Sequence, residues 1–246
     1  MKVVMLLALF GGACLVLYAM RAAAPASAPR ESHVKDLPLV EILAPGRRAV
    51  PGREHDLVIL LTGDGGWAAL DRGLAAAFKD QGVPTVALNS LRYFWKPRIP
   101  EQVAFDLGRV ITHYLQVWRK SRIILVGYSF GADVLPFALN RLPAALRSHI
   151  ATVNLLGLSA TAAFEIRIMD WIRATPGLPV APQLQALSGM RVLCLFGRGD
   201  DAALGDSLPP RSVIKQMVGK GHHFSGEYAV LAERILAFLD EAQGTT

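Results

Sequence analysis

The sequence predicts an α/β protein with a mostly parallel central sheet and helices on both faces. Short, continuous apolar runs recur along the chain, which is typical of strands buried on both faces of a parallel sheet. Amphipathic or Ala-rich stretches of helical length separate these runs. This alternation favours a parallel sheet that helices cover on both sides.

The N-terminus has the composition of an export segment. A short basic start is followed by the apolar run Val3–Met20 and by Ala-x-Ala sites at 22–24 and 26–28. This order predicts a secretory signal peptide. Because the apolar run is long enough to span a bilayer, an uncleaved membrane anchor is the alternative. The expected divisions are an export segment over 1–28, a Pro- and charge-rich linker over 29–52 and the folded domain over 53–246.

Composition indicates one large core and gives no support for nucleic-acid binding or for an intramolecular disulfide. Of 246 residues, 52% are hydrophobic, which is enough for one large core. The net charge of +6 is scattered without a basic run, so the sequence does not indicate nucleic-acid binding, although weak attraction to an anionic membrane is expected. Cys14 and Cys194 are the only cysteines, and Cys14 lies in the export segment, so no intramolecular disulfide is expected in a mature form.

The first half of the chain contains an edge strand, two buried strands and two helices. The strands follow from apolar runs, the first helix from its Ala content, and the second from apolar residues at spacings of three and four. The expected elements are strand Leu39–Leu43, strand Leu57–Leu61, helix Leu70–Asp80, strand Val83–Leu88, loop Asn89–Pro100 and helix Pro100–Trp118.

The second half continues the alternation. The stretch from 159 to 189 lies between two core strands, and its length suits a small cap or excursion over the active site. The expected elements are strand Ile123–Val126, a helix to Arg141, strand Ile150–Leu158, that excursion, strand Val192–Phe196, strand Ser212–Val218 and helix Tyr228–Glu241.

A Gly-x-Ser-x-Gly motif joins the strand before it to the helix after it. It runs from Gly127 to Gly131, and its central residue is Ser129. A strand, sharp turn and helix around this motif form a nucleophile elbow, which lifts the serine Oγ above the sheet edge. The backbone N–H of Phe130, at the new helix N-terminus, is then expected to face an oxyanion formed at Ser129.

An acid and a histidine follow the serine in the order that an elbow hydrolase requires. The acid is expected on the loop after strand Val192–Phe196, where Asp200 is favoured and Asp201 is the alternative. The general base is expected at Gly-His-His-Phe after the last strand, with His222 favoured and His223 the alternative. No clustered Cys or Asp/Glu-His spacing completes a set of metal ligands, and serine ester hydrolysis needs no cofactor.

A Gly-rich loop after the early strand Leu57–Leu61 is expected to supply the second oxyanion donor. The loop reads Thr-Gly-Asp-Gly-Gly-Trp, and the Asp64 backbone N–H is the candidate. Its carboxylate must point away from an oxyanion, be paired, or recognise a cation. The loop lacks the Gly-Lys-Ser/Thr of a phosphate-binding P-loop.

These motifs together resemble the VirJ/AcvB family of bacterial virulence-associated α/β-hydrolases. The resemblance rests on Leu-Thr-Gly-Asp-Gly-Gly-Trp, Leu-Arg-Tyr-Phe-Trp, Gly-Tyr-Ser-Phe-Gly-Ala-Asp-Val-Leu-Pro, Asn-Leu-Leu-Gly-Leu and Gly-His-His-Phe, and it covers about residues 55 to 240. It implies an α/β-hydrolase fold and export to the periplasm, with or without anchoring to the inner membrane. It also implies hydrolysis of the aminoacyl ester of lysyl- or alanyl-phosphatidylglycerol, or an association with type IV secretion. The acid loop of the family is richer in Glu than the corresponding loop of this chain, where only aspartates occur.

The implied substrate has an acyl carbonyl for Ser129 to attack and a cationic amine beside it. Asp64 and Asp133 are expected to pair with that amine. Tyr93 and Trp95 are expected to add a cation–π surface or an apolar wall for the lipid. A general lipase or thioesterase is the alternative within enzymes. A non-catalytic accessory that binds secretion substrates is the alternative outside them.

Overall fold

The computed structural model describes residues 34–44, 51–166, 177–200, 208 and 213–241. The chain divides into two compact units, Met1–Arg30 and Glu31–Thr246, and every described residue belongs to the second. Because the complete sheet and both of its cores lie in this second unit, it has what a separately folding domain needs. The predicted export segment 1–28 and the alternative acid Asp201 lie outside the described residues.

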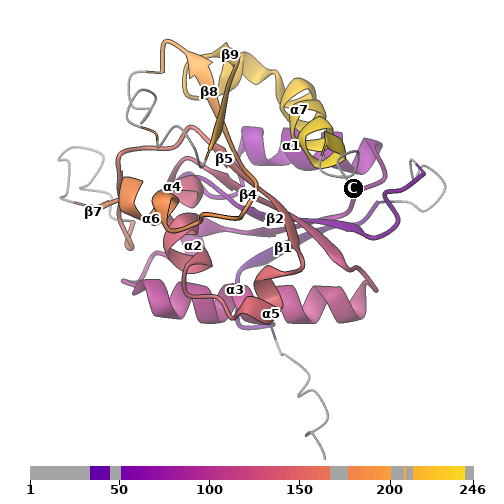
Figure 1. Cartoon of the computed structure of the whole chain (residues 1–246), viewed down its shortest axis with the longest axis horizontal. Coiled ribbons are helices and arrows are strands. Elements are labelled where there is room, and N and C mark those ends of the chain that lie inside the picture. The colour runs from indigo at the N-terminus through magenta and orange to yellow at the C-terminus, as the bar shows by residue number, and fades with distance from the viewer. Residues whose placement is uncertain (1–33, 45–50, 167–176, 201–207, 209–212, 242–246) are drawn as a thin grey trace, which may run out of the picture. The chain divides into compact units, whose positions relative to one another are not determined.

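A seven-stranded sheet forms the centre of the second unit (Figure 1). Its strand order is β1-β3-β2-β4-β5-β8-β9. Strand β1 is antiparallel to β3, and the other neighbours are parallel. The mostly parallel sheet of the α/β-hydrolase fold is therefore confirmed. The strands are β1 (Leu39–Ile42), β2 (Asp56–Leu61), β3 (Thr85–Leu88), β4 (Arg122–Tyr128), β5 (Ile150–Leu156), β8 (Val192–Arg198) and β9 (Ile214–Lys220).

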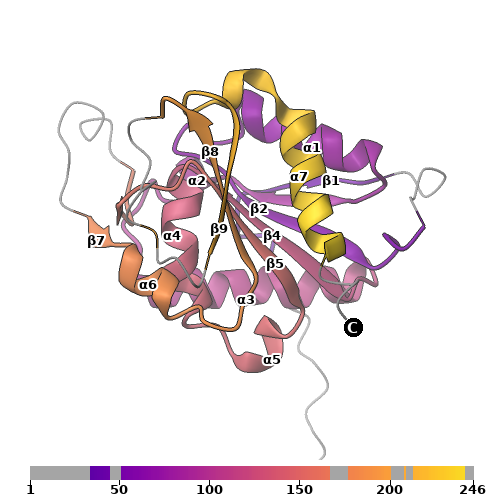
Figure 2. The same ribbon diagram turned by 45° about the horizontal axis from the view of Figure 1, so that its top comes forward.

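Helices cover both faces of this sheet (Figures 1 and 2). Helices α1 and α7 pack against each other on one face, and α3 and α4 pack together on the other. None of the helices in the described ranges combines the length and hydropathy that crossing a bilayer requires. The helices are α1 (Ala69–Asp80), α2 (Ser90–Tyr93), α3 (Pro100–Val117), α4 (Phe130–Leu139), α5 (Ala144–Arg147), α6 (Ala181–Gln185), α7 (Tyr228–Glu241) and a 3₁₀ turn at Phe224–Gly226.

The continuous apolar runs are explained by the two cores. In β2, alternate side chains Leu57, Ile59 and Leu61 join the core under α3 and α4, while Val58 and Leu60 join the core under α1 and α7. Successive side chains of a strand point to opposite faces, so a strand covered on both sides has no polar face. Burying each such side chain contributes roughly 2 kcal/mol.

The excursion predicted near 159–189 forms a small separate hairpin. Strand β6 (Thr161–Ala162) pairs antiparallel with β7 (Leu178–Pro179), and α6 follows. Residues 167–176 between them lie outside the described residues. In the predicted loop Asn89–Pro100 the structure has the single-turn helix α2, because the Asn89 side chain accepts a hydrogen bond from the Arg92 N–H and caps it.

Candidate active site

Ser129 stands at a strained turn between β4 and α4. Strand β4 ends at Tyr128 and α4 begins at Phe130, which leaves Ser129 between them at φ 50° and ψ −118°. A non-glycine residue in this region costs on the order of 1–3 kcal/mol and persists only where packing enforces it. A Cβ at Gly131 would lie 2.2 Å from the Leu61 carbonyl oxygen, and one at Gly127 would lie 2.7 Å from the Ala132 Cα. Both glycines are therefore required for the turn.

Two side chains from distant segments complete a hydrogen-bonded chain with this serine. His222, on the loop after β9, has its Nε2 2.8 Å from Ser129 Oγ and its Nδ1 2.9 Å from Asp200 Oδ2. Asp200 follows β8, in a turn closed by its N–H donating to the Gly197 carbonyl. Its side chain is 3% exposed and that of His222 is 30% exposed, so the acid is buried behind an accessible base. In this geometry Nδ1–H donates to the carboxylate, and Nε2 can accept the serine proton.

His223 does not contact the serine. Its Nδ1 lies 2.7 Å from Tyr128 Oη, and the Tyr128 ring lies 5.6 Å from the His222 ring. Burial is the main cause that raises the pKa of Tyr128 above its ordinary value, so this phenol stays neutral at physiological pH. Tyr128 and His223 thus form a wall beside His222.

Tyr128 and Gly157 were not expected from the sequence as site residues. A Cβ at Gly157 would lie 2.9 Å from His222 Cε1, so the missing side chain makes room for the imidazole. Tyr128 occupies the second position of the elbow motif, which is the one sequence signal that could have pointed to it. Gly157 directly follows β5 and belongs to the Asn-Leu-Leu-Gly-Leu motif of the family resemblance, but that motif did not assign it to the site.

The Gly-rich loop after β2 passes close to Ser129. The N–H of Gly66 donates to the Gly63 carbonyl and closes a tight turn around Asp64. A Cβ at Gly63 would lie 3.1 Å from the Tyr128 ring and 3.6 Å from Ser129 Cβ. The first N–H groups of α4, including that of Phe130, have no partner within the helix. The predicted oxyanion donors Asp64 and Phe130 therefore belong to segments that flank the serine.

A cavity of about 320 Å³ opens beside the serine, and we call it the acidic cavity. Among the described residues, its lining includes Ser129, His222 and His223, together with two carboxylates, Asp64 and Asp71, and no Lys or Arg. Backbone and small side chains of the Gly-rich loop and of the start of α1 make up much of the remaining wall. The charge of this cavity is thus negative wherever its carboxylates are ionised.

Asp71 is a buried carboxylate that the sequence did not single out. Its residue has no exposed surface, its Oδ2 accepts a hydrogen bond of 3.1 Å from the Ala68 N–H, and its Oδ1 has no hydrogen-bond partner. Burial raises the pKa of Asp71 to about 6, against the opposing effect of backbone N–H groups, first that of Ala68. A buried acceptor without a partner costs free energy, which an N–H donor arriving in the cavity could recover.

Three residues predicted to bind substrate lie elsewhere. The Asp133 Oδ1 accepts a 2.7 Å hydrogen bond from the Ser159 N–H, and its side chain is buried behind α4. The Tyr93 hydroxyl donates to Asp106 at 2.6 Å inside the core. Trp95 is 57% exposed on the loop between α2 and α3. None of the three lines the acidic cavity, so the structure does not bring them together with Ser129 there, and their role in substrate binding stays a prediction. Among the described residues, no group of three or more His, Cys, Asp or Glu has the arrangement of a metal site.

Solved structures of similar fold support this architecture. Est1E from Butyrivibrio proteoclasticus aligns with a TM-score of 0.59 at 12% identity, over 84% of this chain and 94% of that chain. A thioesterase domain from the curacin biosynthetic pathway gives 0.52 at 14% identity, over 81% and 94%. Proline iminopeptidase from Mycobacterium smegmatis gives 0.55 at 14% identity, over 83% and 95%. At these identities the likeness shows the fold alone, and the fold does not specify which bond is cleaved.

The sequence comparisons identify the family. No curated protein matches the chain. The family profile described as "Bacterial virulence protein (VirJ)" matches residues 55–243, which include the Gly-rich loop, the elbow and the histidine loop. This match covers most of the chain, and it agrees with the fold and with the order of motifs. The chain belongs to the VirJ family of bacterial virulence proteins.

Proposed function

We propose that this protein is an exported serine hydrolase that cleaves the aminoacyl ester of aminoacyl-phosphatidylglycerol at the membrane surface. The observation that carries the proposal is the position of the acidic cavity directly at the Ser129–His222–Asp200 chain. The hydrogen-bonded chain supports attack on an acyl carbonyl. The two carboxylates of the cavity suit an acyl group that carries an ammonium, such as an alanyl or a lysyl group.

Acylation begins with His222. Its Nε2 removes the proton from Ser129 Oγ, which attacks the aminoacyl carbonyl carbon, while Asp200 stabilises the imidazolium through Nδ1–H. The oxyanion is stabilised by backbone N–H groups, for which Phe130 and Asp64 are the candidates. When the tetrahedral intermediate collapses, the ester C–O bond breaks and His222 returns its proton to the departing glycerol oxygen. Phosphatidylglycerol leaves, and the aminoacyl group remains on Ser129.

Deacylation repeats the same proton transfers with water. His222 removes a proton from water, the hydroxyl oxygen attacks the acyl carbonyl, and Ser129 Oγ recovers the proton as the free amino acid departs. In both steps the α-ammonium nitrogen of the substrate lies two bonds from the carbonyl carbon, because it is attached to the α-carbon. Carboxylates at the wall of the same small cavity are therefore close enough to distinguish this substrate from a neutral fatty ester.

The test is to incubate residues 31–246 with lysyl- and alanyl-phosphatidylglycerol in mixed micelles and to measure free amino acid by mass spectrometry. Ser129→Ala tests the nucleophile. Ser148→Ala, an exposed serine at the end of α5, is the matched control. We expect release by wild type and by Ser148→Ala, and none by Ser129→Ala. Folded protein that releases no amino acid but hydrolyses neutral esters would indicate a general lipase or thioesterase. Inactivity on every ester would favour the accessory role in secretion.

A further inference from the structure

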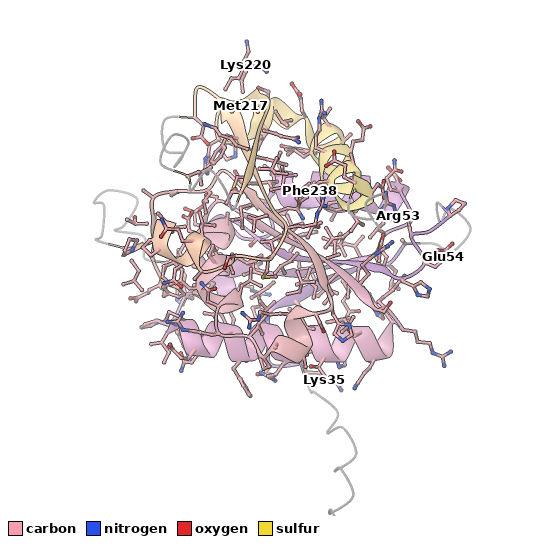
Figure 3. All side chains as sticks on the ribbon, in the orientation of Figure 1. Lys35, Arg53, Glu54, Met217, Lys220 and Phe238 are labelled. Atoms are coloured by element: carbon pink, nitrogen blue, oxygen red, sulfur yellow. The ribbon has the colours of Figure 1, made fainter. Side chains whose placement is uncertain are left out.

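A second depression, of about 440 Å³, lies on the segment between β3 and α3. Its lining brings together Lys35, Arg92, Trp95, Lys96 and Arg98, and we call it the basic depression. Lys35 reaches it from the segment before β1, where the Asn89 N–H donates to the Pro38 carbonyl and joins the two stretches of chain. Figure 3 labels Lys35 on the side of the sheet that α3 covers.

The charge of this depression is largely unmatched. Asp36 is the acid among its lining residues, and it is paired with Arg109 of α3. Lys35, Arg92 and Lys96 are exposed and form no ion pair with another described residue. Arg98 is held in place, because its guanidinium lies 4.4 Å from the Tyr93 ring centre and its Nε donates to the Tyr93 carbonyl. Within the part of the chain that the structure describes, the depression therefore presents three exposed cations, Lys35, Arg92 and Lys96, that are not paired with an acid.

A large apolar side chain is exposed within the basic depression. Trp95, which lines it, is 57% exposed. Further along the chain, Ile99 is 54% exposed and Phe105, in the second turn of α3, is 69% exposed. An indole next to Lys and Arg is the combination that lies at the boundary between lipid headgroups and acyl chains.

Packing and a hydrogen bond connect the segment that carries the basic depression to segments of the candidate active site. Phe94, next to Trp95, packs edge-on against Phe130 with ring centres 4.8 Å apart, and Phe130 directly follows Ser129. Ser90 at the start of α2 donates its hydroxyl to the Thr62 carbonyl at 2.6 Å, and Thr62 is the first residue of the Gly-rich loop. The segment that carries the depression thus packs against segments that build the site.

We propose that the basic depression docks this protein on an anionic phospholipid membrane, with Lys35, Arg92 and Lys96 against lipid phosphates and Trp95 in the interface. Charge complementarity carries the choice of partner, since anionic bilayers attract exposed Lys and Arg. The docking goes beyond the proposed function, because it requires no hydrolysis.

The experiment is sedimentation of residues 31–246 with phosphatidylglycerol vesicles and with phosphatidylcholine vesicles. The test variant combines Lys35→Gln, Arg92→Gln and Lys96→Gln. Its matched control combines Lys79→Gln, Arg119→Gln and Arg234→Gln, which remove the same charge from other exposed positions. We expect binding to phosphatidylglycerol to weaken about fivefold for each cation removed, or on the order of 100-fold in the test variant. The control should lose much less, and both variants should keep wild-type hydrolysis of a soluble ester.

Three results would overturn the proposal. Wild type could fail to bind phosphatidylglycerol vesicles, the two triple variants could lose binding equally, or inorganic phosphate could bind at the depression while vesicles do not. Trp95→Ala is a second test, because it should weaken vesicle binding although it changes no charge. Repeating the sedimentation with Ser129→Ala separates this proposal from the enzymatic one, since docking should persist in a chain that cannot turn over substrate.

Discussion

The acidic cavity and the basic depression are two hollows with opposite charge. The cavity is lined by the carboxylates Asp64 and Asp71 without a Lys or Arg, whereas the depression gathers four cations around one acid that is already paired. An aminoacylated anionic lipid has the same division, with an ammonium on the acyl group and phosphate in the membrane around it. The overall positive charge of the chain therefore says little about the chemistry at Ser129, because the cations and the carboxylates line separate hollows.

The largest expected effect is on hydrolysis at the acidic cavity, and it should leave vesicle binding at the basic depression unchanged. Ser129→Ala should lower kcat/KM for aminoacyl-phosphatidylglycerol by about 10⁴- to 10⁶-fold, because it removes the nucleophile. Vesicle binding should stay at the wild-type level, since Ser129 does not line the basic depression. Steady-state kinetics and sedimentation on one preparation give both values. Residual turnover within tenfold of wild type would exclude Ser129 as the nucleophile.

Asp200→Asn should lower kcat by about 10⁴-fold, because an amide can favour the wrong tautomer of His222 and cannot stabilise its imidazolium. The measurement is kcat on a soluble ester, with circular dichroism to check folding. Asp201→Asn is the neighbouring control, and it should retain most activity. The reverse result, with the greater loss in Asp201→Asn, would transfer the role of the acid to the neighbouring residue.

Asp71→Asn should reduce the preference for a cationic substrate by about 10- to 100-fold, the range for one hydrogen bond to a charged group. The quantity to measure is kcat/KM for a lysyl ester divided by that for a neutral ester, so that effects on the shared catalytic groups cancel. The substitution keeps the shape of the side chain and removes its charge. Asp64→Asn should act in the same direction. Equal losses on both esters, in both variants, would contradict cation recognition by the cavity.

The same ratio should depend on pH in wild type. Burial raises the pKa of Asp71 to about 6, so in the free enzyme this carboxyl becomes neutral as the pH falls through 6. The cationic preference should therefore be full above pH 7 and decline below pH 6, whereas in Asp71→Asn this decline should be absent. Because kcat/KM reports the titration of the free enzyme, the bound ammonium does not disturb the comparison. A ratio that is constant from pH 5 to 8 in wild type would contradict it.

The smallest effect comes from Asp133, a buried carboxylate whose Oδ1 is already occupied by the Ser159 N–H. Burial raises the pKa of Asp133 to about 7, so between about pH 4 and 7 the folded state holds a proton that the unfolded state has released. The free energy of unfolding should fall by about 1.4 kcal/mol per pH unit as pH rises through this window. Asp133→Asn should remove this contribution to the slope in urea titrations and leave substrate preference unchanged. An unchanged slope would contradict the assignment.

The fold could be predicted because its signals are local. Short apolar runs such as Leu57–Leu61 indicate strands with both faces buried. The glycines at 127 and 131 lie where the strand and helix backbones approach too closely for a side chain. Serine, acid and histidine each follow a different strand of the sheet. Because parallel strands end at the same edge, the three residues were expected to lie close together. Asp200 was preferred over Asp201 and His222 over His223, and in the structure Asp200 and His222 lie within hydrogen-bond distance of each other. His222 also lies within hydrogen-bond distance of Ser129.

The surroundings of the site could not be predicted in the same way. Asp133 lies only four residues after Ser129, yet the helical turn points it at the Ser159 N–H on the buried side of α4. Asp71 has no motif of its own, but the first turn of α1 folds back on the Gly-rich loop and brings its carboxylate to the cavity wall. Trp95 follows two buried aromatic residues and is itself exposed.

The strands, the elbow and the hydrogen-bonding residues of the candidate triad could thus be predicted from the amino-acid order. These features depend on backbone geometry, which apolar periodicity and glycine positions specify within a few residues. Which carboxylates line the cavity, and which cations lie around Trp95, became known from the folded arrangement alone. Lys35 and Lys96 line one depression, and Asp71 and Gly63 line one cavity, because packing between whole elements brings distant segments together.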